Sequence, residues 1–148
     1  MLYADPDKAW GMSIFLNIPT SDVERSKVFF TAIGWSVNPN FSDENAVSVE
    51  MSDGQYLMAL HRDYYQTFIG DKTVGDPATQ SLALIAFDLD SREAVDAFLE
   101  TVGKAGGKVG KIQDHGFMYG GQFDDPDGNH FEPFWMDPEA AAGGPPAA

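Results

Sequence analysis

The most constraining feature of this 148-residue chain is an internal repeat. Ser21-Asp22-Val23-Glu24 has the pattern of a helix-capping box, with a Ser N-cap and a Glu three residues later. Asp90-Ser91-Arg92-Glu93 repeats this capping-box pattern 69 residues further on. The apolar residues that follow correspond at the same offset, so each copy predicts a helix of about three turns. The matched pairs are Phe29 and Phe98, Phe30 and Leu99, Ile33 and Val102, and Gly34 and Gly103.

Strand-like runs surround both helices at matching positions. One run precedes each helix, at 13–19 and at 82–89. Three more follow each helix, and they lie at 35–37, 46–51 and 56–61 in the first copy and at 108–112, 117–123 and 130–135 in the second. The last turns also match, Asp53-Gly54-Gln55 against Asp127-Gly128-Asn129, at an offset of 74, so the second copy has gained about five residues. The sequence therefore predicts an α+β fold of two βαβββ units.

The predicted organisation has five segments. An N-terminal extension (1–11) precedes the first unit (12–61), a linker (62–80) leads to the second unit (81–137), and a tail (138–148) ends the chain. Gly70, Gly75 and Pro77 break the linker. The tail has almost nothing to bury and is expected to be disordered.

Composition limits the classes of function. The chain has no cysteine, which excludes disulfides, thiol chemistry and cysteine-ligated metals. A net charge of −14 argues against nucleic-acid partners and anionic membrane surfaces, and it is compatible with a cationic ligand or simply with solubility. No apolar run is long enough to span a bilayer, and residues 1–11 lack the apolar core of a signal peptide. A cytoplasmic location is expected.

Glu132 is the side chain that most needs an explanation. It follows the turn Asp125-Pro126-Asp127-Gly128 and lies inside an aromatic-rich strand. Alternate side chains of a strand point to its buried face. A carboxylate that points to an interior is costly unless it has a partner, a ligand or a proton.

Two stretches carry a resemblance to a known family, residues 16–30 (LNIPTSDVERSKVFF) and residues 123–132 (FDDPDGNHFE). With the repeat, they resemble the vicinal oxygen chelate superfamily, which includes glyoxalase I, extradiol dioxygenases, and fosfomycin- and bleomycin-resistance proteins. The resemblance covers about residues 12–137. It implies that the two units, related by pseudo-twofold symmetry, form a barrel-like cup, and that the protein is a homodimer.

The resemblance also implies four metal-ligand positions, on the first and last strands of each unit. They correspond to Phe15, Met58, Leu84 and Glu132. Phenylalanine and leucine have no lone pair to offer, and a thioether is a poor ligand for hard divalent ions. We therefore expect no metal and no other cofactor. A weaker alternative is an improvised metal site formed by His130, Glu132 and His115.

Without a metal, the same positions predict a site for an organic ligand. Phe15, Leu84 and Met58 would form an apolar floor around Glu132, and Asn17 shares the strand face of Phe15. Tyr119 lies in a glycine-rich strand and offers a ring and a hydroxyl for a planar ligand. Glu132 could act as a general acid or base, pair with a cationic ligand group, or be a vestigial acid held by Asn17 or a tyrosine.

Three functions remain open at this point. The first is a glyoxalase/bleomycin-resistance-like protein that binds a small, cationic or amphipathic organic molecule in an apolar cup without a metal. The second is an enzyme, a lyase or isomerase with Glu132 as its base, or a dioxygenase-like protein with an improvised metal site. The third is a ligand-free domain used for dimerisation.

Overall fold

The computed structural model describes residues 11–147, so nearly all of the predicted N-terminal extension lies outside the described residues. The chain divides into two compact units between Asp71 and Lys72, inside the predicted linker 62–80. Each unit has its own sheet and its own long helix.

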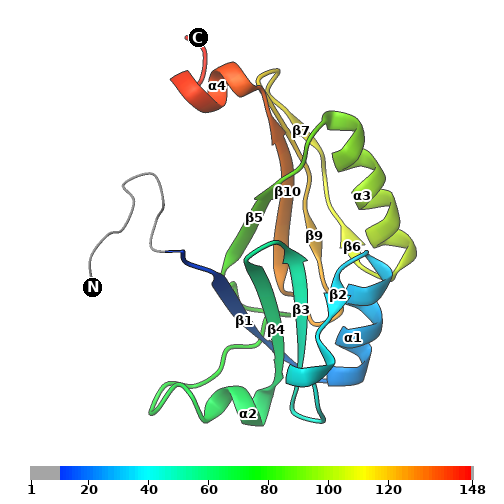
Figure 1. The fold of residues 1–148 in the computed structure, drawn as a ribbon, viewed down its shortest axis with the longest axis vertical. Coiled ribbons are helices and arrows are strands. Elements are labelled where there is room, and N and C mark those ends of the chain that lie inside the picture. Colours follow the sequence, from blue (N-terminus) through cyan, green and yellow to red (C-terminus); the bar gives the residue numbers. More distant parts are fainter. Residues whose placement is uncertain (1–10, 148) are drawn as a thin grey trace. The chain divides into compact units, whose positions relative to one another are not determined.

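The first unit is a four-stranded sheet crossed by one long helix (Figure 1). Its strand order is β1-β4-β3-β2, with β1 parallel to β4 and the other neighbours antiparallel. The elements are β1 (Ile14–Thr20), α1 (Val23–Ala32), β2 (Ser36–Val37), the 3₁₀ helix η1 (Pro39–Phe41), β3 (Ala46–Ser52), β4 (Gln55–His61) and α2 (Arg62–Gln66). The predicted βαβββ order of this unit is confirmed. The short helices η1 and α2 were not predicted.

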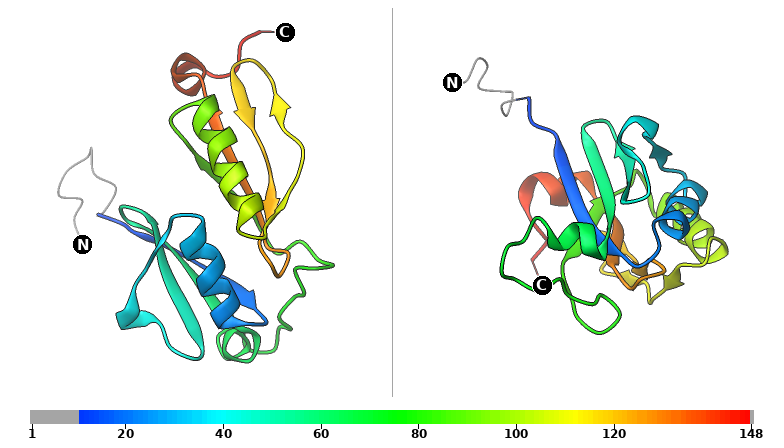
Figure 2. Two further views of the ribbon diagram at one scale, coloured as in Figure 1. Left: turned by 90° about the vertical axis from the view of Figure 1, so that its right-hand side faces the viewer. Right: turned by 90° about the horizontal axis from the view of Figure 1, so that it is seen from below.

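The second unit repeats this topology with its middle strands interrupted. Its elements are β5 (Leu84–Asp88), α3 (Arg92–Lys104), β6 (Lys108–Val109), β7 (Gln113–Asp114), β8 (Met118–Gly120), β9 (Phe123–Asp124), β10 (His130–Met136) and α4 (Pro138–Gly143). Strand β5 is parallel to β10, as β1 is to β4. Strands β8 and β9 pair with β10 in one continuous antiparallel register, so they are two parts of the predicted strand 117–123. Figure 2 shows α1 and α3 lying across their own sheets.

A β-bulge interrupts the strand that contains β6 and β7. Gly110 donates its N–H to the carbonyl of Gln122, whereas Gln113 pairs with Gly120, so Lys111 and Ile112 both lie opposite Gly121. One extra residue on one strand of a pair is the definition of a bulge, and bulges redirect nearby side chains. The predicted strand 108–112 is therefore split, and its second part extends to Asp114.

The five extra residues of the second copy can now be located. Helix α3 has 13 residues and α1 has 10, which accounts for three of them. The registers place the other two between β6 and β8, the segment that contains the bulge. The two copies are otherwise aligned position by position.

The helix starts differ by one residue from the predicted capping boxes. Asp22, not Ser21, is the N-cap of α1, and its side chain accepts a hydrogen bond from the Arg25 N–H at 2.9 Å. Ser91 is the N-cap of α3 and accepts from the Ala94 N–H at 3.0 Å. Both caps shift in the same direction, so the offset of 69 is preserved. Short oxygen-bearing side chains at this position satisfy a free N–H of the first turn.

Each core lies between a sheet and its long helix. In the first unit, Phe30 and Leu57 are 0% exposed. In the second, Val95 and Phe131 are 0% exposed, and the Phe123 ring stacks on Phe131 with centroids 4.9 Å apart. Fully burying a side chain of this size contributes about 2–3 kcal/mol. We call the sheet face opposite each long helix the distal face of that unit.

The C-terminal segment differs from the disordered tail predicted for 138–148. Pro138–Gly143 form the helix α4, which begins with a proline at its first turn and is capped by Asp137. Proline suits this position because its missing N–H has no partner in a first turn. Among residues 11–147, no helix is both long and apolar enough to cross a membrane.

Candidate functional site

Glu132 lies on the distal face of the second unit. Along β10, Phe131 and Pro133 are buried on the side of α3, so the residues that alternate with them, His130, Glu132 and Phe134, point to the distal face. The Glu132 side chain is 38% exposed. Its environment is therefore half-open rather than a closed apolar interior.

The partner of Glu132 is the histidine two residues before it. Nε2 of His130 lies 3.3 Å from Oε2 of Glu132, and Nδ1 lies 2.8 Å from Oδ1 of Asp124. A neutral imidazole donates through one nitrogen only. With Nδ1 donating to Asp124, the contact between Nε2 and Oε2 needs one further proton, carried by His130 or by Glu132. The carboxylate is thus held by a row of three titratable side chains.

A tight turn brings Asp124 opposite His130. Asp125 is 4% exposed, and its Oδ1 accepts the backbone N–H groups of Asp127, Gly128 and Asn129 at 2.9–3.0 Å. Its Oδ2 accepts from the Asn129 side chain at 3.0 Å. Burial raises the pKa of the Asp125 carboxyl to about 6, although these donors favour its charged form. The motif that drew attention to Glu132 therefore sets the register of β9 and β10.

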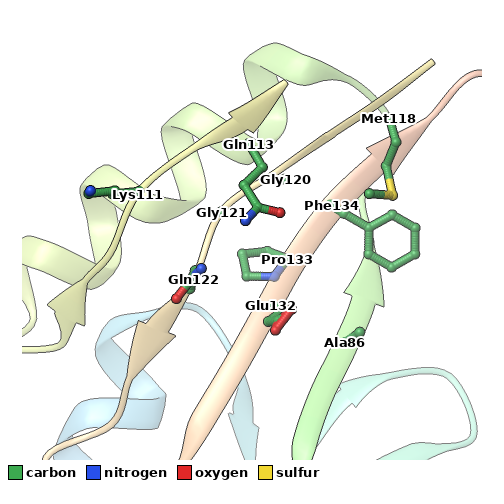
Figure 3. Close-up of a pocket in the computed structure, with 10 residues that line it drawn as sticks. All are labelled: Ala86, Lys111, Gln113, Met118, Gly120, Gly121, Gln122, Glu132, Pro133 and Phe134. Carbon is green, nitrogen blue, oxygen red and sulfur yellow. The ribbon is translucent and has the colours of Figure 1, made fainter. Parts of the chain in front are cut away.

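A shallow pocket of about 180 Å³ lies beside Glu132 on the same face (Figure 3). Polar side chains of Lys111, Gln113 and Gln122 line it together with Glu132. The remaining lining residues are apolar or glycine, namely Ala86, Met118, Gly120, Gly121, Pro133 and Phe134.

Glycine and the bulge create the space for this pocket. A Cβ on Gly120 would lie 3.2 Å from the Cβ of Phe134, which is tighter than ordinary contact. The bulge at Lys111 and Ile112 brings the strand from Lys111 to Gln113 along the rim. The result is a carboxylate and two amides around an apolar floor, with Lys111 at the edge and its ammonium directed away from Glu132 (Figure 3).

The four positions implied for a divalent metal do not fit one. Phe15 and Leu84 offer no donor atom, Met58 offers a thioether, and Glu132 is engaged by His130. Within the described part of the chain, no group of three His, Asp or Glu side chains, the row of Asp124, His130 and Glu132 included, has an arrangement that could hold a metal ion. The structure joins His130 and Glu132 but not His115, whose ring lies against Phe117 with centroids 6.3 Å apart.

The strand registers reproduce the repeat at the predicted site. Phe15 pairs with Tyr56 on β4, as Leu84 pairs with His130 on β10. Asn17 pairs with Met58, as Ala86 pairs with Glu132. The β5 neighbour of Glu132 is therefore Ala86, not Leu84.

The apolar floor expected around Glu132 is not formed inside either unit. Phe15 and Met58 belong to the first unit, and Leu84 and Glu132 to the second. Phe15 is 56% exposed and stacks on Tyr56 with centroids 4.6 Å apart, and Leu84 is 68% exposed.

Tyr119 does not lie on the face of Glu132. It pairs with Trp135, on the α3 side of the sheet, and its hydroxyl donates to Oδ1 of Asp96 on α3 at 2.6 Å. This hydrogen bond raises the pKa of the Tyr119 phenol. Tyr119 thus joins sheet to helix, and its contact with a ligand stays a prediction.

Arg92 completes that contact and holds the β7–β8 hairpin. It donates to both carboxylate oxygens of Asp114, at 2.9 and 3.1 Å, and to the carbonyl of Gly116 at 2.7 Å. Its guanidinium lies 5.0 Å from the ring centroid of Tyr119 and 5.3 Å from that of Trp135. The hydrogen bonds to Arg92 lower the pKa of Asp114. Because Gln113 precedes Asp114, the clamp fixes the strand that carries a pocket amide.

Sequence reasoning missed Asp124, Gln113 and Gln122. The turn is recognisable in the sequence, and pairing the residues on its two sides would have placed Asp124 opposite His130. Extending the same register would have placed Gln122 opposite Glu132. No sequence signal locates Gln113, because the bulge shifts its strand by one residue.

Comparisons with known proteins agree with this architecture. Residues 13–52 match a family model described as bleomycin resistance protein-like N-terminal. No curated protein matches the chain.

Solved structures match most of the chain at low identity. The hypothetical protein SA1046 from S. aureus has a TM-score of 0.72 at 23% identity, covering 84% of this chain and 93% of that one. A glyoxalase/bleomycin resistance protein/dioxygenase family enzyme from Burkholderia phytofirmans PsJN has a TM-score of 0.69 at 20% identity, covering 82% and 96%. The fosfomycin resistance protein FosX from Mesorhizobium loti has a TM-score of 0.62 at 15% identity, covering 87% and 95%.

At such identities the likeness of structure establishes the fold and leaves the activity open. The first unit adds the sequence match at 13–52. The chain therefore has the glyoxalase/bleomycin-resistance fold, and its residues 13–52 are similar to the N-terminal part of bleomycin resistance-like proteins.

Proposed function

We propose that this protein binds a small, cationic or amphipathic organic molecule at the Glu132 pocket, without a divalent metal. The observation that carries the proposal is the pairing of one carboxylate with an apolar, glycine-floored hollow on the same face. Gln113 and Gln122 add two amides that can orient polar groups of the ligand. A net charge of −14 favours the approach of cations and disfavours anions.

Oligomerisation and location belong to the same proposal. A cytoplasmic homodimer, with no nucleic-acid or membrane partner, is what the acidic composition and the resemblance suggest. Phe15 and Leu84 are 56% and 68% exposed, so both distal faces present apolar surface. Exposed apolar surface of this kind is what a ligand or a contact between copies would cover.

Charge selectivity tests the proposal directly. Benzamidine, benzamide and benzoate are near-isosteric and carry positive, zero and negative charge. We expect titration calorimetry or NMR to show that benzamidine binds best of the three at this pocket. Glu132→Gln should weaken it about tenfold, as expected for loss of a charge-assisted hydrogen bond. Among natural compounds, bleomycin and fosfomycin, for which relatives are named, are first to test, with the cationic bleomycin preferred.

Glu100→Gln is the matched control. Glu100 lies on α3, has a side chain 69% exposed, and pairs with Lys104 at 3.1 Å. Its substitution changes the net charge by the same amount as Glu132→Gln but leaves the pocket intact. An equal loss of benzamidine affinity in both variants would reject Glu132 as the recognition group.

The row of Asp124, His130 and Glu132 favours one second candidate function. An imidazole and a carboxylate 3.3 Å apart beside a pocket suit general acid–base catalysis, as in a metal-independent lyase or isomerase. Turnover separates the two functions. In an enzyme, Glu132→Gln abolishes turnover while substrate still binds, whereas in a binding protein the only change is in retention of the ligand.

A further inference from the structure

The first unit contains a second pocket with different chemistry. It has a volume of about 320 Å³ and is lined by Asn17, Leu60, Tyr65, Phe68 and Ile69. All of these residues belong to the first unit, and all residues of the Glu132 pocket belong to the second. The two pockets are therefore formed by different sets of elements.

The segment after β4 builds one wall of this pocket. Tyr65, Phe68 and Ile69 have the i, i+3, i+4 spacing of one helical face. His61 starts α2 by accepting the Asp63 N–H at 3.3 Å. The turn after α2 continues through hydrogen bonds from the Phe68 N–H to the Tyr65 carbonyl at 3.0 Å and from the Ile69 N–H to the Gln66 carbonyl at 3.4 Å. The side chains of Tyr65, Phe68 and Ile69 therefore lie together on one wall of the pocket.

The opposite wall comes from the sheet and supplies the amide. Leu60 on β4 is 4% exposed and forms an apolar base. Asn17 on β1 donates through Nδ2 to the carbonyl of Phe15 at 3.3 Å, which directs its amide along the strand. Among residues 11–147, no donor is bonded to its Oδ1, which makes this oxygen the acceptor available to a ligand.

The lining is less favourable for ions than for flat, uncharged rings. None of the five lining residues is charged, so a charged ligand would lose hydration without gaining a counter-ion. Phe68 is 65% exposed, and its ring is held edge-on by Tyr64 with centroids 5.0 Å apart. Such an exposed, oriented ring beside a second aromatic residue offers stacking surface.

We propose that this pocket is a binding site for an uncharged planar aromatic group that carries an N–H donor for Asn17. A primary carboxamide on an aromatic ring is the simplest example. The site is independent of Glu132 and selects a neutral ligand, so it extends the chemistry of the protein beyond cation recognition.

The test uses benzamide, with benzamidine and benzoate as charged isosteres, titrated into the full chain and followed by backbone-amide NMR. We expect benzamide to shift the resonances of α2 and of β1, and to bind here at least about fivefold more tightly than either charged isostere. Asn17→Ala should weaken benzamide about fivefold through loss of one hydrogen bond. Ile69→Trp should abolish binding by filling the pocket without removing core contacts.

Two control variants show whether these effects are specific to the pocket. Val28→Ala changes an exposed apolar residue of α1, 62% exposed, and should leave benzamide binding unchanged. Glu132→Gln should also leave benzamide unchanged while it weakens benzamidine, so failure of one site is distinguishable from failure of the other.

Three outcomes would overturn the proposal. The first is benzamide binding that survives Ile69→Trp in a variant with wild-type spectra. The second is equal affinity for the three isosteres at α2. The third is a change of molar mass, measured by light scattering, when Ile69→Trp is introduced, because the pocket would then be a contact between copies of the chain.

Discussion

Nδ1 of His130 lies 2.8 Å from Oδ1 of Asp124, across the turn that joins β9 to β10. The two side chains are 26% and 35% exposed, so water screens part of their attraction. Their main effect is orientation, because Asp124 holds the ring with Nε2 towards Glu132. Asp124 is therefore a positioning residue for the pocket carboxylate.

The hydrogen-bonded row of Asp124, His130 and Glu132 predicts that substitutions within it change the free energy of unfolding non-additively. Asp124→Ala and His130→Ala should each lower the free energy of unfolding by about 0.5–1 kcal/mol, the range of partly exposed pairs. The double variant should cost little more than the His130 variant alone, since the second change removes a contact that is already lost. Urea denaturation of the four proteins gives the coupling energy. Additive losses would show that the ring is held by other contacts.

Asp125 predicts a pH dependence of opposite sign to that of a salt-bridged carboxylate. Its folded pKa of about 6 lies above the ordinary value of about 3.9, so the folded state binds the proton more tightly. Its contribution to stability is complete below about pH 4 and is lost as the pH rises through about 6, by up to about 3 kcal/mol. Asp125→Asn keeps an acceptor for the backbone donors and removes the titration.

Urea denaturation between about pH 4 and pH 7 checks this prediction. Other carboxylates titrate in the same range, so the relevant quantity is the difference between the wild type and the Asn variant. That difference should shift in favour of the variant as the pH rises from about 4 to 6. A constant difference across this range would contradict the effect of burial on Asp125.

The turn glycine Gly128 is expected to be intolerant of substitution. Its φ is +103°, and a Cβ there would lie 2.6 Å from the carbonyl oxygen of Pro77 in the linker. Gly116 is the matched control, because its φ is +79° and nothing lies within 4 Å of its Cβ position. Gly116→Ala should cost about 1 kcal/mol, whereas Gly128→Ala should cost about 3 kcal/mol or more, because backbone must move. Equal losses of stability in the two variants, measured by thermal or urea unfolding, would mean that the linker backbone at Pro77 moves aside at little cost.

Arg92 predicts a local rather than a global effect. Arg92→Lys keeps the charge but loses the two-pronged contact with Asp114 and the planar stacking on Tyr119 and Trp135. Amide hydrogen exchange should accelerate in the β7–β8 hairpin and remain near wild type in the first unit. Uniform acceleration throughout the second unit would instead indicate that Arg92 supports the whole core.

The two faces of β8 provide a paired test of the pocket. Met118 lines the pocket, whereas Tyr119 packs towards α3. Met118→Ala should weaken benzamidine binding severalfold by removing part of the apolar floor. Tyr119→Phe should leave the affinity within about twofold, because it removes only the hydrogen bond to Asp96. The reverse order of effects would restore Tyr119 as a ligand contact.

The topology could be predicted from the sequence because the repeat doubles every signal. Phe30 and Leu99 reinforce each other as core positions of the two helices, and Gly54 and Gly128 do the same as turn positions. The parallel pairing of the first and last strands then follows from the same order of elements in both copies. Local signals were less exact, since the N-caps are Asp22 and Ser91 rather than the preceding residues.

The site was only partly predictable from the sequence, because it depends on the register of paired strands and on which face of the sheet each side chain occupies. Glu132 and Asn17 were predicted to line one cup, and they line separate pockets in different units, while their roles in ligand binding stay predictions. The sequence did not predict the hydrogen bond from the Tyr119 hydroxyl to Asp96 on α3. The hairpin that precedes Tyr119 is fixed by an ion pair between Arg92 and Asp114. Contacts 22 residues apart in sequence leave no local pattern.

The confinement of each pocket to one repeat has an evolutionary consequence. Gln122 and Glu132 occupy the positions that Ser48 and Met58 occupy in the first copy. The first-unit pocket is lined by other positions, Asn17 and Leu60 among them, so a substitution in the lining of one pocket leaves the residues of the other in place. The two halves of the gene can therefore diverge as separate modules, each adapting its own ligand preference under selection while both keep the same strand order.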